Sequence, residues 1–402
     1  MKVINIGDLT TKRIIKMIRE KGPISRIDIS QATQIPQPTL TRITEELLKS
    51  NIIQESGRAP AARGRRPVLL TFNPNCYYSI GLQLTRTKFA AALTDLNGRI
   101  QSIRSHRISA GTRFSEVMER VYRAIDQVVE ESGVEAGRIL GIGVGLPGPI
   151  NKTKDGTVSP PYFFGEKNIP LASMLEERYR LPTFIDNSAN VATIAEKWFG
   201  KGIGLQHFLY ILAENGIGAG LIVNGNIYRG VIGEAGTLGH TTIDVRGELC
   251  SCGNYGCLET FVSMGKVEEQ VRNKLKIGFG DERALYPSNL EEITLEHIVD
   301  ALRRGSRLAE RTFEEAGQYL GIGIANAVNL FNPELVILGG KLGMSSAVLA
   351  ESVKKTMDRQ LSRRNKRTRI VVSELEQAVV LGAAAIVIDD AFSLYSENDA
   401  GG

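Results

Sequence analysis

The sequence is poor in cysteine, histidine and aromatic residues, and it lacks any long apolar run. Its 402 residues include four cysteines, four histidines and one tryptophan, and aromatic residues make up 6% of the chain. No apolar stretch reaches the eighteen or so residues that a membrane-spanning helix needs. The first residues also lack the charged start and apolar core of a secretion signal. We therefore expect a cytoplasmic protein with no membrane partner.

A chain of 402 residues exceeds what one hydrophobic core usually serves, so two or three domains are expected. Hydrophobic residues make up 42% and charged residues 23%, as in soluble globular proteins. Glycine is abundant at 42 residues, and it is spread through short apolar segments instead of forming low-complexity tracts. This distribution is typical of an α/β protein with many tight turns.

Positive charge is concentrated at the N-terminal end. Residues 1–72 contain thirteen Lys or Arg and six Asp or Glu, a net charge of +7, whereas the whole chain carries +5. The rest of the chain is therefore slightly acidic. A basic end on a near-neutral body is typical of a nucleic-acid-binding module, although a solvated basic face gives the same composition.

Three short helices are predicted in the first fifty residues. Apolar residues repeat at helical spacing over residues 9–21, and Gly22 ends that helix. Ser25 and Asp28 have the spacing of a capping box at the start of a second helix, which runs to about residue 33. The third helix follows a tight turn, and its apolar face consists of Leu40, Ile43 and Leu47.

Three helices with a tight second turn are typical of a helix-turn-helix, in which the third helix reads base edges in the major groove. The outward residues near the start of that helix are Gln37, Thr39, Thr41 and Arg42. We predict that these four contact double-stranded operator DNA. The same helices also fit a small bundle without a DNA-binding role.

Two predicted strands follow, at residues 51–55 and 68–72, with a loop rich in Gly, Pro, Ala and Arg between them. This pattern predicts a β-wing. Arg63, Arg65 and Arg66 in the loop resemble the arginines of minor-groove AT-hook segments, which enter a narrow and strongly negative groove. A solvated arginine-rich loop is the alternative. Together with the three helices, the wing indicates a winged helix-turn-helix.

Downstream of residue 77 short apolar strands alternate with helices. The predicted order is strands at 78–84 and 88–94, a helix at 114–131 and a buried strand at 139–146. A similar order recurs, with strands at 207–212 and 220–223, a long helix at 308–330 and a strand at 335–338. Two such lobes describe an actin-like kinase architecture.

Three of the four cysteines lie within eight positions, and a histidine precedes them. His240 is followed after nine residues by Cys250, after one more by Cys252 and after four more by Cys257. Three thiolates and one imidazole complete a tetrahedral Zn²⁺ site with no open position, which favours a structural over a catalytic metal. Buried free cysteines and an unrelated histidine are the alternative.

Several segments together resemble the ROK family, which contains repressors and sugar kinases. The residues that carry the likeness are Gly239-His240, the run from Cys250 to Glu259, the run from Gly145 to Pro149, and Leu338-Gly339-Gly340. It extends over roughly residues 75–390. The resemblance implies an α/β chain in which a winged helix-turn-helix precedes a two-lobed actin-like (ROK sugar kinase) fold.

We predict three domains on this basis. Residues 1–73 form the DNA-binding domain, residues 74–200 the first ROK lobe, and residues 201–402 the second lobe with the zinc knuckle. The C-terminal helix is expected to be able to pack back on the first lobe. The whole implies a transcriptional repressor of carbohydrate-utilisation genes whose ROK domain senses a ligand.

Three positions that ROK kinases use for catalysis differ here. The resemblance places Gln83 where family kinases have an acidic residue, Glu214 at the start of the second phosphate segment, and Ser188 in place of the catalytic aspartate. Serine cannot take a proton from a sugar hydroxyl at neutral pH. We therefore expect no catalytic residue and no enzymatic activity. An active ATP-dependent sugar kinase with an appended DNA-binding domain is the alternative.

The resemblance also implies an effector site for a sugar or related polyol. Family residues that contact sugar hydroxyls match Asn187, His240 and Glu259, while Ser188 and Thr237 replace acidic residues of the family. Structural hydrogen bonding by Asn187 and Glu259 is the alternative. Because operator palindromes mirror a two-fold protein, a homodimer or a dimer of dimers is expected.

Overall fold

The computed structural model describes residues 9–58, 66–150, 156–159, 163–278, 280–363 and 365–392. The chain divides into two units, the first comprising Met1–Leu146, Lys152–Asp186 and Val380–Gly402 and the second Pro147–Asn151 and Asn187–Val379. The three-domain division of the sequence, with boundaries after residues 73 and 200, stays a prediction. Within the described ranges, no helix combines the length and the apolar character needed to span a bilayer.

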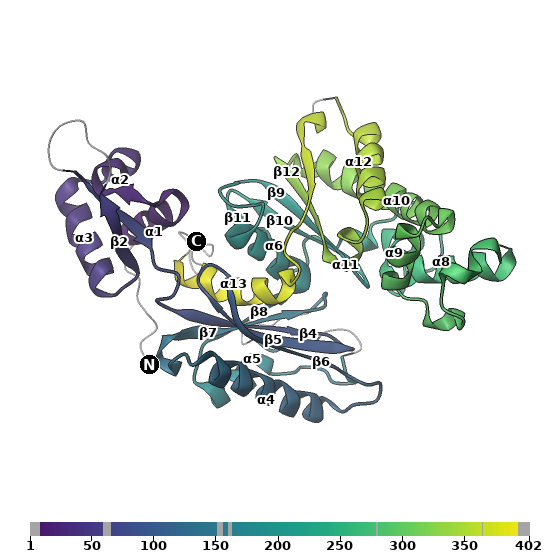
Figure 1. Cartoon of the computed structure of the whole chain (residues 1–402), viewed down its shortest axis with the longest axis horizontal. Coiled ribbons are helices and arrows are strands. Elements are labelled where there is room, and N and C mark those ends of the chain that lie inside the picture. Colours follow the sequence, from purple (N-terminus) through teal and green to yellow (C-terminus); the bar gives the residue numbers. More distant parts are fainter. Residues whose placement is uncertain are drawn as a thin grey trace. The chain divides into compact units, whose positions relative to one another are not determined.

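The first unit begins with three helices and a small sheet (Figure 1). The helices are α1 (Leu9–Lys21), α2 (Arg26–Thr33) and α3 (Gln37–Lys49), and the strands β1 (Ile24–Ser25), β2 (Ile53–Arg58) and β3 (Val68–Phe72) lie in the order β1-β3-β2. The predicted capping box is present, since the Ser25 hydroxyl accepts from the Asp28 N–H at 3.2 Å and the Asp28 carboxylate accepts from the Ser25 N–H at 3.4 Å. Strand β2 begins two residues later than predicted because Asn51, with φ +58°, turns the chain after α3.

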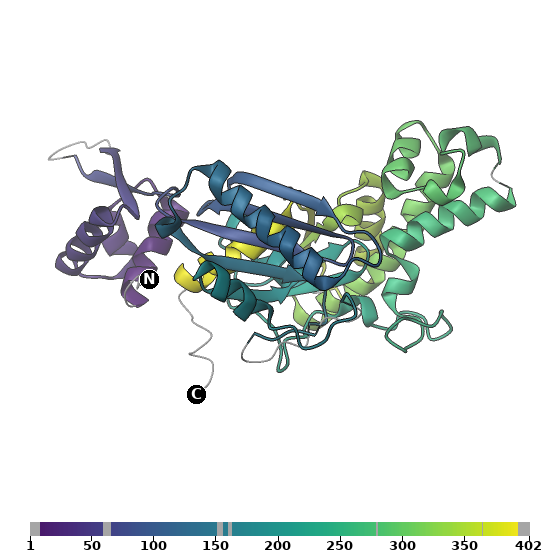
Figure 2. The ribbon, with the colours of Figure 1, turned by 90° about the horizontal axis from the view of Figure 1, so that it is seen from below.

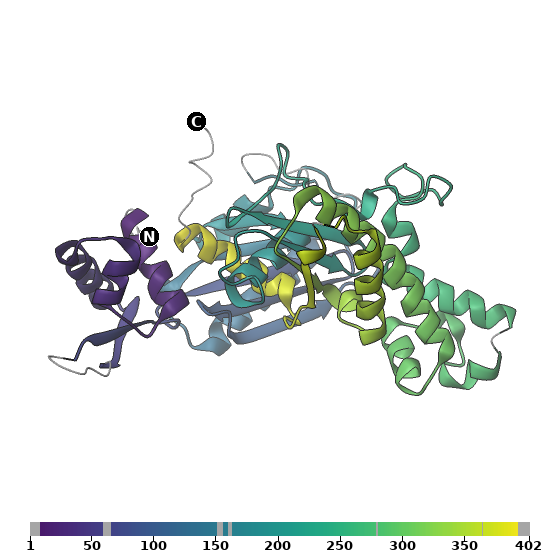
Figure 3. The same ribbon diagram turned by 90° about the horizontal axis from the view of Figure 1, so that it is seen from above.

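The rest of the first unit is a five-stranded sheet between helices. The strands β4 (Tyr78–Leu84), β5 (Lys88–Asp95), β6 (Ile100–Arg107), β7 (Ile139–Leu146) and β8 (Thr183–Asn187) lie in the order β6-β5-β4-β7-β8. Strand β4 is antiparallel to β5 and parallel to β7. The helices are α4 (Phe114–Ser132), α5 (Leu171–Tyr179) and α13 (Ala378–Phe392). Figure 2 shows α4 lying across the strands, and Figure 3 shows α13 on the opposite side.

Helix α13 lies directly on the backbone of this sheet because glycines face it. A Cβ atom at Gly81 of β4 would lie 2.1 Å from the carbonyl oxygen of Val380, and one at Gly143 of β7 would lie 1.6 Å from that of Ala383. Residues 378–388 of α13 are all buried. A helix that is apolar on every side is typical of a protein core.

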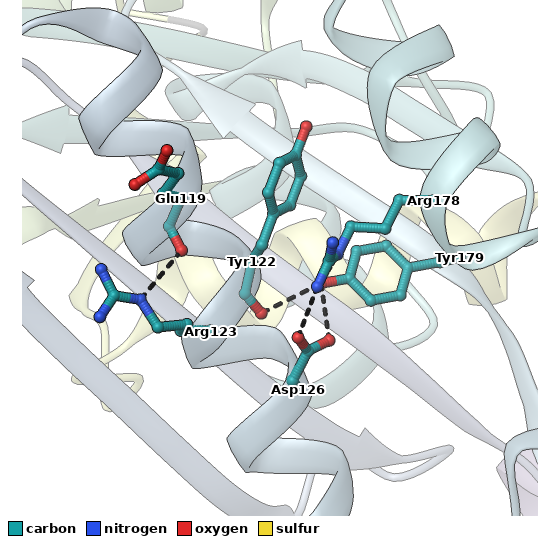
Figure 4. A network of polar contacts seen from close by, with 6 residues as sticks. All are labelled: Glu119, Tyr122, Arg123, Asp126, Arg178 and Tyr179. Atoms are coloured by element: carbon teal, nitrogen blue, oxygen red, sulfur yellow. Dashed lines mark hydrogen bonds and ion pairs between the residues drawn. The ribbon is translucent and has the colours of Figure 1, made fainter.

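On the surface of the first unit, two side chains of α5 hold it against α4 (Figure 4). The Arg178 guanidinium lies 2.8 Å from the Asp126 carboxylate and 4.8 Å from the centroid of the Tyr122 ring. The Tyr179 hydroxyl lies 3.0 Å from both the Tyr122 carbonyl and the Asp126 carboxylate. Because the ion pair is half exposed, it contributes at most about 1 kcal/mol.

The second unit repeats the arrangement of the first sheet. The strands β9 (Phe208–Ala213), β10 (Ile217–Val223), β11 (Asn226–Ile227), β12 (Leu335–Gly339) and β13 (Arg369–Val372) lie in the order β11-β10-β9-β12-β13. Strand β9 is antiparallel to β10 and parallel to β12. If the five strands of each sheet are numbered in the order in which they occur along the chain, both sheets have the order 3-2-1-4-5. This shared order gives the two predicted lobes.

Helices cover both faces of the second sheet. Helix α6 (Ser188–Phe199) packs on β9 and β10. The apolar residues on the other face, among them Leu209 and Ile211, join a core built with the longer helices that follow. The remaining elements are α7 (Leu258–Phe261), α8 (Met264–Ile277), α9 (Leu295–Arg303), α10 (Arg307–Phe331), α11 (Gly340–Gly343), α12 (Ala347–Gln360) and short 3-10 turns at Ala136–Arg138, Leu238–His240, Gly280–Leu285, Leu290–Glu292 and Asn365–Arg367.

Replacing Gly143 by alanine should destabilise the first unit, because the added Cβ would collide with the Ala383 carbonyl and displace α13. We expect the free energy of unfolding in urea to fall by about 1–3 kcal/mol. Gly137→Ala is the matched control, since a Cβ at Gly137 meets nothing within 4 Å. That substitution should change the value by no more than about 0.5 kcal/mol. Equal losses in the two variants would contradict the close packing of α13.

Candidate functional site

His240 and three cysteines of the second unit converge on one point. The ligand atoms of His240, Cys250, Cys252 and Cys257 all lie within 4.8 Å of one another. The His240 Nδ1 atom is 3.5 Å from the Cys250 Sγ atom, and the Sγ atoms of Cys252 and Cys257 are 3.7 Å apart. Tetrahedral zinc, with bonds of about 2.0–2.3 Å, separates its ligand atoms by about 3.5–3.8 Å. The two measured distances match the edges of such a tetrahedron, and a disulfide would need about 2.05 Å.

The segment that carries the cysteines folds back on itself through short backbone hydrogen bonds. The Cys250 N–H donates to the Asn254 carbonyl at 2.7 Å, and the Gly253 N–H donates to the Cys250 carbonyl at 2.9 Å. Gly256 has φ +65°, and a Cβ there would lie 1.6 Å from the Asp244 carbonyl oxygen. Only glycine fits this position, so the turn between the second and third cysteine is set by the backbone.

Three neighbouring thiols ionise together only beside a cation. Burial, together with the adjacent Cys252 and Cys250, raises the pKa of Cys257 to about 12. The backbone N–H of Asn254 holds the pKa of the exposed Cys252 below its usual value. A bound divalent ion deprotonates coordinating thiols outright. The donor set of three sulfurs and one imidazole therefore fits a soft metal ion.

The metal-binding cluster is joined to the start of β10. The Glu259 carboxylate, two residues after Cys257, accepts from the Ile217 N–H at 3.0 Å. A Cβ atom at Gly239 would lie 3.2 Å from the same carboxylate oxygen and 2.4 Å from the Ile217 carbonyl oxygen. The two segments that carry the metal ligands thus enclose the first residue of β10. One oxygen of Glu259 has the structural hydrogen bond that the alternative interpretation expected.

The first turn of α6 lies beside the same part of β10. Asn187 caps α6, and its side-chain oxygen accepts from the Asn190 N–H at 2.8 Å. Ser188, the first residue of the helix, is half-buried. A Cβ at Gly218 of β10 would lie 3.0 Å from the Cβ of Ala189. The structure therefore brings Ala189 of α6 and Glu259 to the first two residues of β10, and Asn187 and Ser188 directly precede Ala189 in the chain.

Thr237 differs from these residues in being exposed. Its hydroxyl donates to the Glu234 carbonyl at 2.7 Å, so it stabilises its own turn. The adjoining Gly236 carbonyl accepts from the Ala219 N–H of β10 at 2.8 Å. Thr237 thus begins the short turn that ends at His240.

The hairpin between β4 and β5, which the sequence resemblance compared with a phosphate segment, is closed by a side chain. The Thr85 hydroxyl accepts from the Lys88 N–H at 3.1 Å and donates to the Lys88 carbonyl at 2.8 Å. Gln83 is buried in β4. A glycine-rich turn offers such backbone N–H groups to phosphate oxygens. Here the Thr85 side chain takes one of them.

Glu196 of α6 is fully buried in the second unit. Its carboxylate accepts from the Ser373 hydroxyl and, at 2.8 Å, from the Lys201 N–H. Burial raises the pKa of Glu196 above its usual value, and these two donors oppose the rise. A Cβ at Gly200 would lie 2.0 Å from the carboxylate, so no ligand group fits on that side. Glu196 therefore ties α6 to the segment after β13.

The recognition-helix residues predicted from the sequence lie on α3. Gln37 and Arg42 are exposed, whereas Thr39 and Thr41 are half-buried. The Thr41 hydroxyl donates to the Gln37 carbonyl at 2.9 Å, and Arg42 pairs with Glu46 at 2.8 Å. Of the three wing arginines, Arg66 is exposed, and Arg63 and Arg65 lie outside the described residues.

A bond that the sequence did not predict connects α2 to the recognition helix α3. The Arg26 Nε atom of α2 donates to the Thr44 hydroxyl of α3 at 2.8 Å, and Thr44 is fully buried. Thr44 directly follows Ile43 on the inner face of α3. A polar residue at a core position indicates a buried partner, and this signal was available in the sequence.

Two models of known protein families match the chain. The ROK family model matches residues 79–390. A winged helix-turn-helix DNA-binding model matches residues 8–54. The chain belongs to the ROK family, and the predicted winged helix-turn-helix and actin-like ROK fold are confirmed.

Similar proteins match over nearly the whole length. The chain is 34% identical to the xylose repressor of Caldicellulosiruptor bescii, over 94% of this chain and 95% of that protein. It is 29% identical to the N-acetylglucosamine repressor of Escherichia coli O157:H7, over 95% and 93% of the two chains. A solved ROK family transcriptional regulator, a homologue of the E. coli MLC protein, has a TM-score of 0.79 and 30% identity over 96% of each chain.

The purified protein should hold about one tightly bound metal ion per chain, since four ligands close the coordination sphere. Cys252→Ser should remove most of it, because a serine hydroxyl is a poor ligand for a soft ion. Cys252 is exposed, so the substitution disturbs no core. Ser251→Ala, in the same turn, is the matched control and should keep the ion. Metal analysis after dialysis is the measurement, and equal metal content in both variants would sink the assignment.

Proposed function

We propose that this chain is a DNA-binding transcriptional repressor of carbohydrate-utilisation genes, and that its ROK domain binds a sugar or related polyol as effector. The observation that carries this proposal is the full-length match to repressors, which spans the winged helix-turn-helix as well as the ROK domain. A shared kinase-like fold alone would not separate a sensor from an enzyme.

Operator DNA is the proposed macromolecular partner. Gln37, Thr39, Thr41 and Arg42 lie on the N-terminal half of α3, where helix-turn-helix proteins contact base edges. Arg63, Arg65 and Arg66 of the wing are proposed to contact the minor groove or phosphates. The net charge of +7 over residues 1–72 supports contacts between this domain and DNA phosphates, because such contacts supply most of the non-specific affinity for DNA.

The proposed cofactor is one structural zinc ion held by His240, Cys250, Cys252 and Cys257. Zinc accepts this donor set in closed tetrahedral sites and supplies binding energy to the fold there. The residues on either side of the cluster hold Glu259 against β10. The metal thus serves to fix the segment that presents Glu259.

The effector site is proposed to comprise Asn187, Ser188, Thr237, His240 and Glu259. In support of this proposal, Glu259 bonds to the first residue of β10, Asn187 and Ser188 lie at the start of α6, which packs on β10, and Thr237 and His240 belong to one short turn. Carboxylate, amide and hydroxyl groups can recognise the hydroxyls of a sugar or polyol by hydrogen bonds. His240 would act first as metal ligand.

We propose further that the domain does not catalyse phosphoryl transfer. Ser188 is a poor general base, and losing a positioned base costs about 10²–10⁴ in rate. The closed hairpin at Thr85 and the acidic side chain of Glu214 are both unfavourable for binding ATP phosphates. We also propose that the protein assembles as a homodimer or a dimer of dimers and acts in the cytoplasm on a two-fold operator.

Mutations should distinguish the role of α3 in DNA binding from the role of the wing. Arg42→Ala should cost about 1–3 kcal/mol on the operator and relax preference at one base position. Replacing Arg65 and Arg66 together by alanine should weaken binding to operator and scrambled DNA alike and flatten the salt dependence. Arg363→Ala, an exposed arginine of the second unit, is the control and should change neither.

These affinities are measured on duplexes selected in vitro with the wild-type chain, across about 50–200 mM salt. A uniform loss for Arg42→Ala on operator and scrambled DNA would contradict base reading by α3. No enriched sequence for the wild type would contradict the repressor function itself.

The effector and kinase hypotheses are separated with one panel of hexoses, pentoses and polyols. A coupled ADP-release assay should show no turnover with any of them, and turnover near one per second, a typical enzyme value, would restore the kinase alternative. A thermal-shift measurement with the same panel should find at least one ligand. At a hundred times its Kd, such a ligand stabilises the chain by about 2.7 kcal/mol. Asn187→Ala should abolish that shift.

A further inference from the structure

Residues 73–77 connect β3 of the DNA-binding domain to β4 of the first sheet. On the side of the DNA-binding domain, the connector is anchored through Asn73. Its backbone N–H donates to the Ile52 carbonyl at 2.9 Å, and its side-chain amide donates to the Asn51 carbonyl at 2.9 Å. Asn73 is buried. The first connector residue is thus fixed to the end of the helix-turn-helix.

The other end of the connector is anchored to the first sheet. The Leu96 N–H, just after β5, donates to the Pro74 carbonyl at 3.0 Å. The Arg138 guanidinium, just before β7, donates to the carbonyls of both Asn75 and Cys76, the latter at 3.2 Å. It also lies 5.1 Å from the centroid of the Tyr78 ring. One side chain therefore ties together the connector and two strands of the sheet.

Helix α13 supports the same junction. The Phe392 ring meets the Phe72 ring of β3 edge-on, with centroids 6.1 Å apart. Arg19 of α1 is half-buried, and this burial lowers its pKa to about 10, while the nearby Glu20 and Asp389 carboxylates oppose the effect. Since α13 itself packs on the backbone of the sheet, the DNA-binding domain has a second contact with a rigid element.

We propose that Arg138 is a positioning residue that makes the connector a rigid joint, so that a dimer accepts two DNA half-sites at one spacing. The proposal rests on the proposed function as an operator-binding dimer. Arginine suits this role because its planar guanidinium donates to two carbonyls in fixed directions, whereas the three donors of a lysine lie on one nitrogen at the end of a flexible chain. The backbone carbonyls of Asn75 and Cys76 would otherwise turn to solvent.

The length of the connector shows why its stiffness matters. A flexible tether of five residues has a root-mean-square span of about 12 Å. One base pair advances the helix by about 3.4 Å. A free connector would therefore let the two DNA-binding domains reach half-sites whose spacing differs by about three base pairs. A fixed connector selects one register and raises the effective concentration of the second domain.

The test is in vitro selection of random duplexes by the full-length chain. Wild type should enrich paired half-sites at a single spacing. Arg138→Ala should enrich the same half-site sequence at several spacings, and its affinity for the best pair should fall about ten-fold while its affinity for one half-site is unchanged. Arg138→Lys, which keeps the charge but not the fork, should lie between them.

Arg178→Ala is the matched control. Like Arg138, Arg178 lies against an aromatic ring and also binds oxygen acceptors, in this case through an ion pair. It joins α5 to α4 and does not touch the connector (Figure 4). It should select DNA as wild type does. Metal content and melting temperature report that each variant is folded. Amide hydrogen exchange of Asn73 and of residues 75–77 should be faster in Arg138→Ala alone.

Several outcomes would overturn the proposal. A single unchanged spacing in Arg138→Ala would show that the joint does not set the register. An equal loss of affinity for one and for two half-sites would give Arg138 a general structural role. If wild type enriched DNA without paired half-sites, the rigid-joint inference would be wrong, but the proposed DNA-binding function would remain supported. If wild type enriched no DNA, the proposed function would fail, and the inference with it.

Discussion

On each central sheet, a helix packs directly against the strand backbone at glycine residues. This close approach sets the position of the functional segments. Gly81 and Gly143 leave room for α13 on the first sheet. In the second sheet, a Cβ at Gly220 of β10 would lie 1.9 Å from the Thr193 hydroxyl of α6. The contact brings the first turn of α6, with Asn187 and Ser188, beside β10. Any larger residue at these glycines would separate helix and sheet.

The metal-binding segment depends on a different constraint. Its large apolar side chains are exposed, with Val245 83%, Leu249 61% and Tyr255 60% accessible, so the segment has almost no core of its own. A metal ion bound by the four ligand atoms, which lie within 4.8 Å of one another, would supply the fixed point that burial does not. Small segments without a core commonly depend on metal ligation in this way. Such an ion would also help to hold Glu259 against Ile217.

The DNA-binding domain and the kinase-like body illustrate how function changes on a retained scaffold. The two central sheets share one strand order, and four residues of the second unit could hold a metal ion. The Thr85 hydroxyl closes the hairpin between β4 and β5, and Ser188 is the first residue of α6. A fold tolerates changes at such turns and helix ends, because the core is not affected.

The sequence by itself determined the features that depend on neighbours along the chain. Periodicity located most helices and strands, the Ser25–Asp28 spacing located a cap, and the cysteine spacing located the metal cluster, because these patterns follow from local backbone geometry. It did not reveal β6, in which Ile100 and Ile103 are the large apolar residues and no position is buried. Nor did it reveal the partners of Arg138, 62 and 63 residues away, or of Glu259, 42 residues away. Only the tertiary structure decided those bonds, because packing of distant segments selects the polar groups that meet.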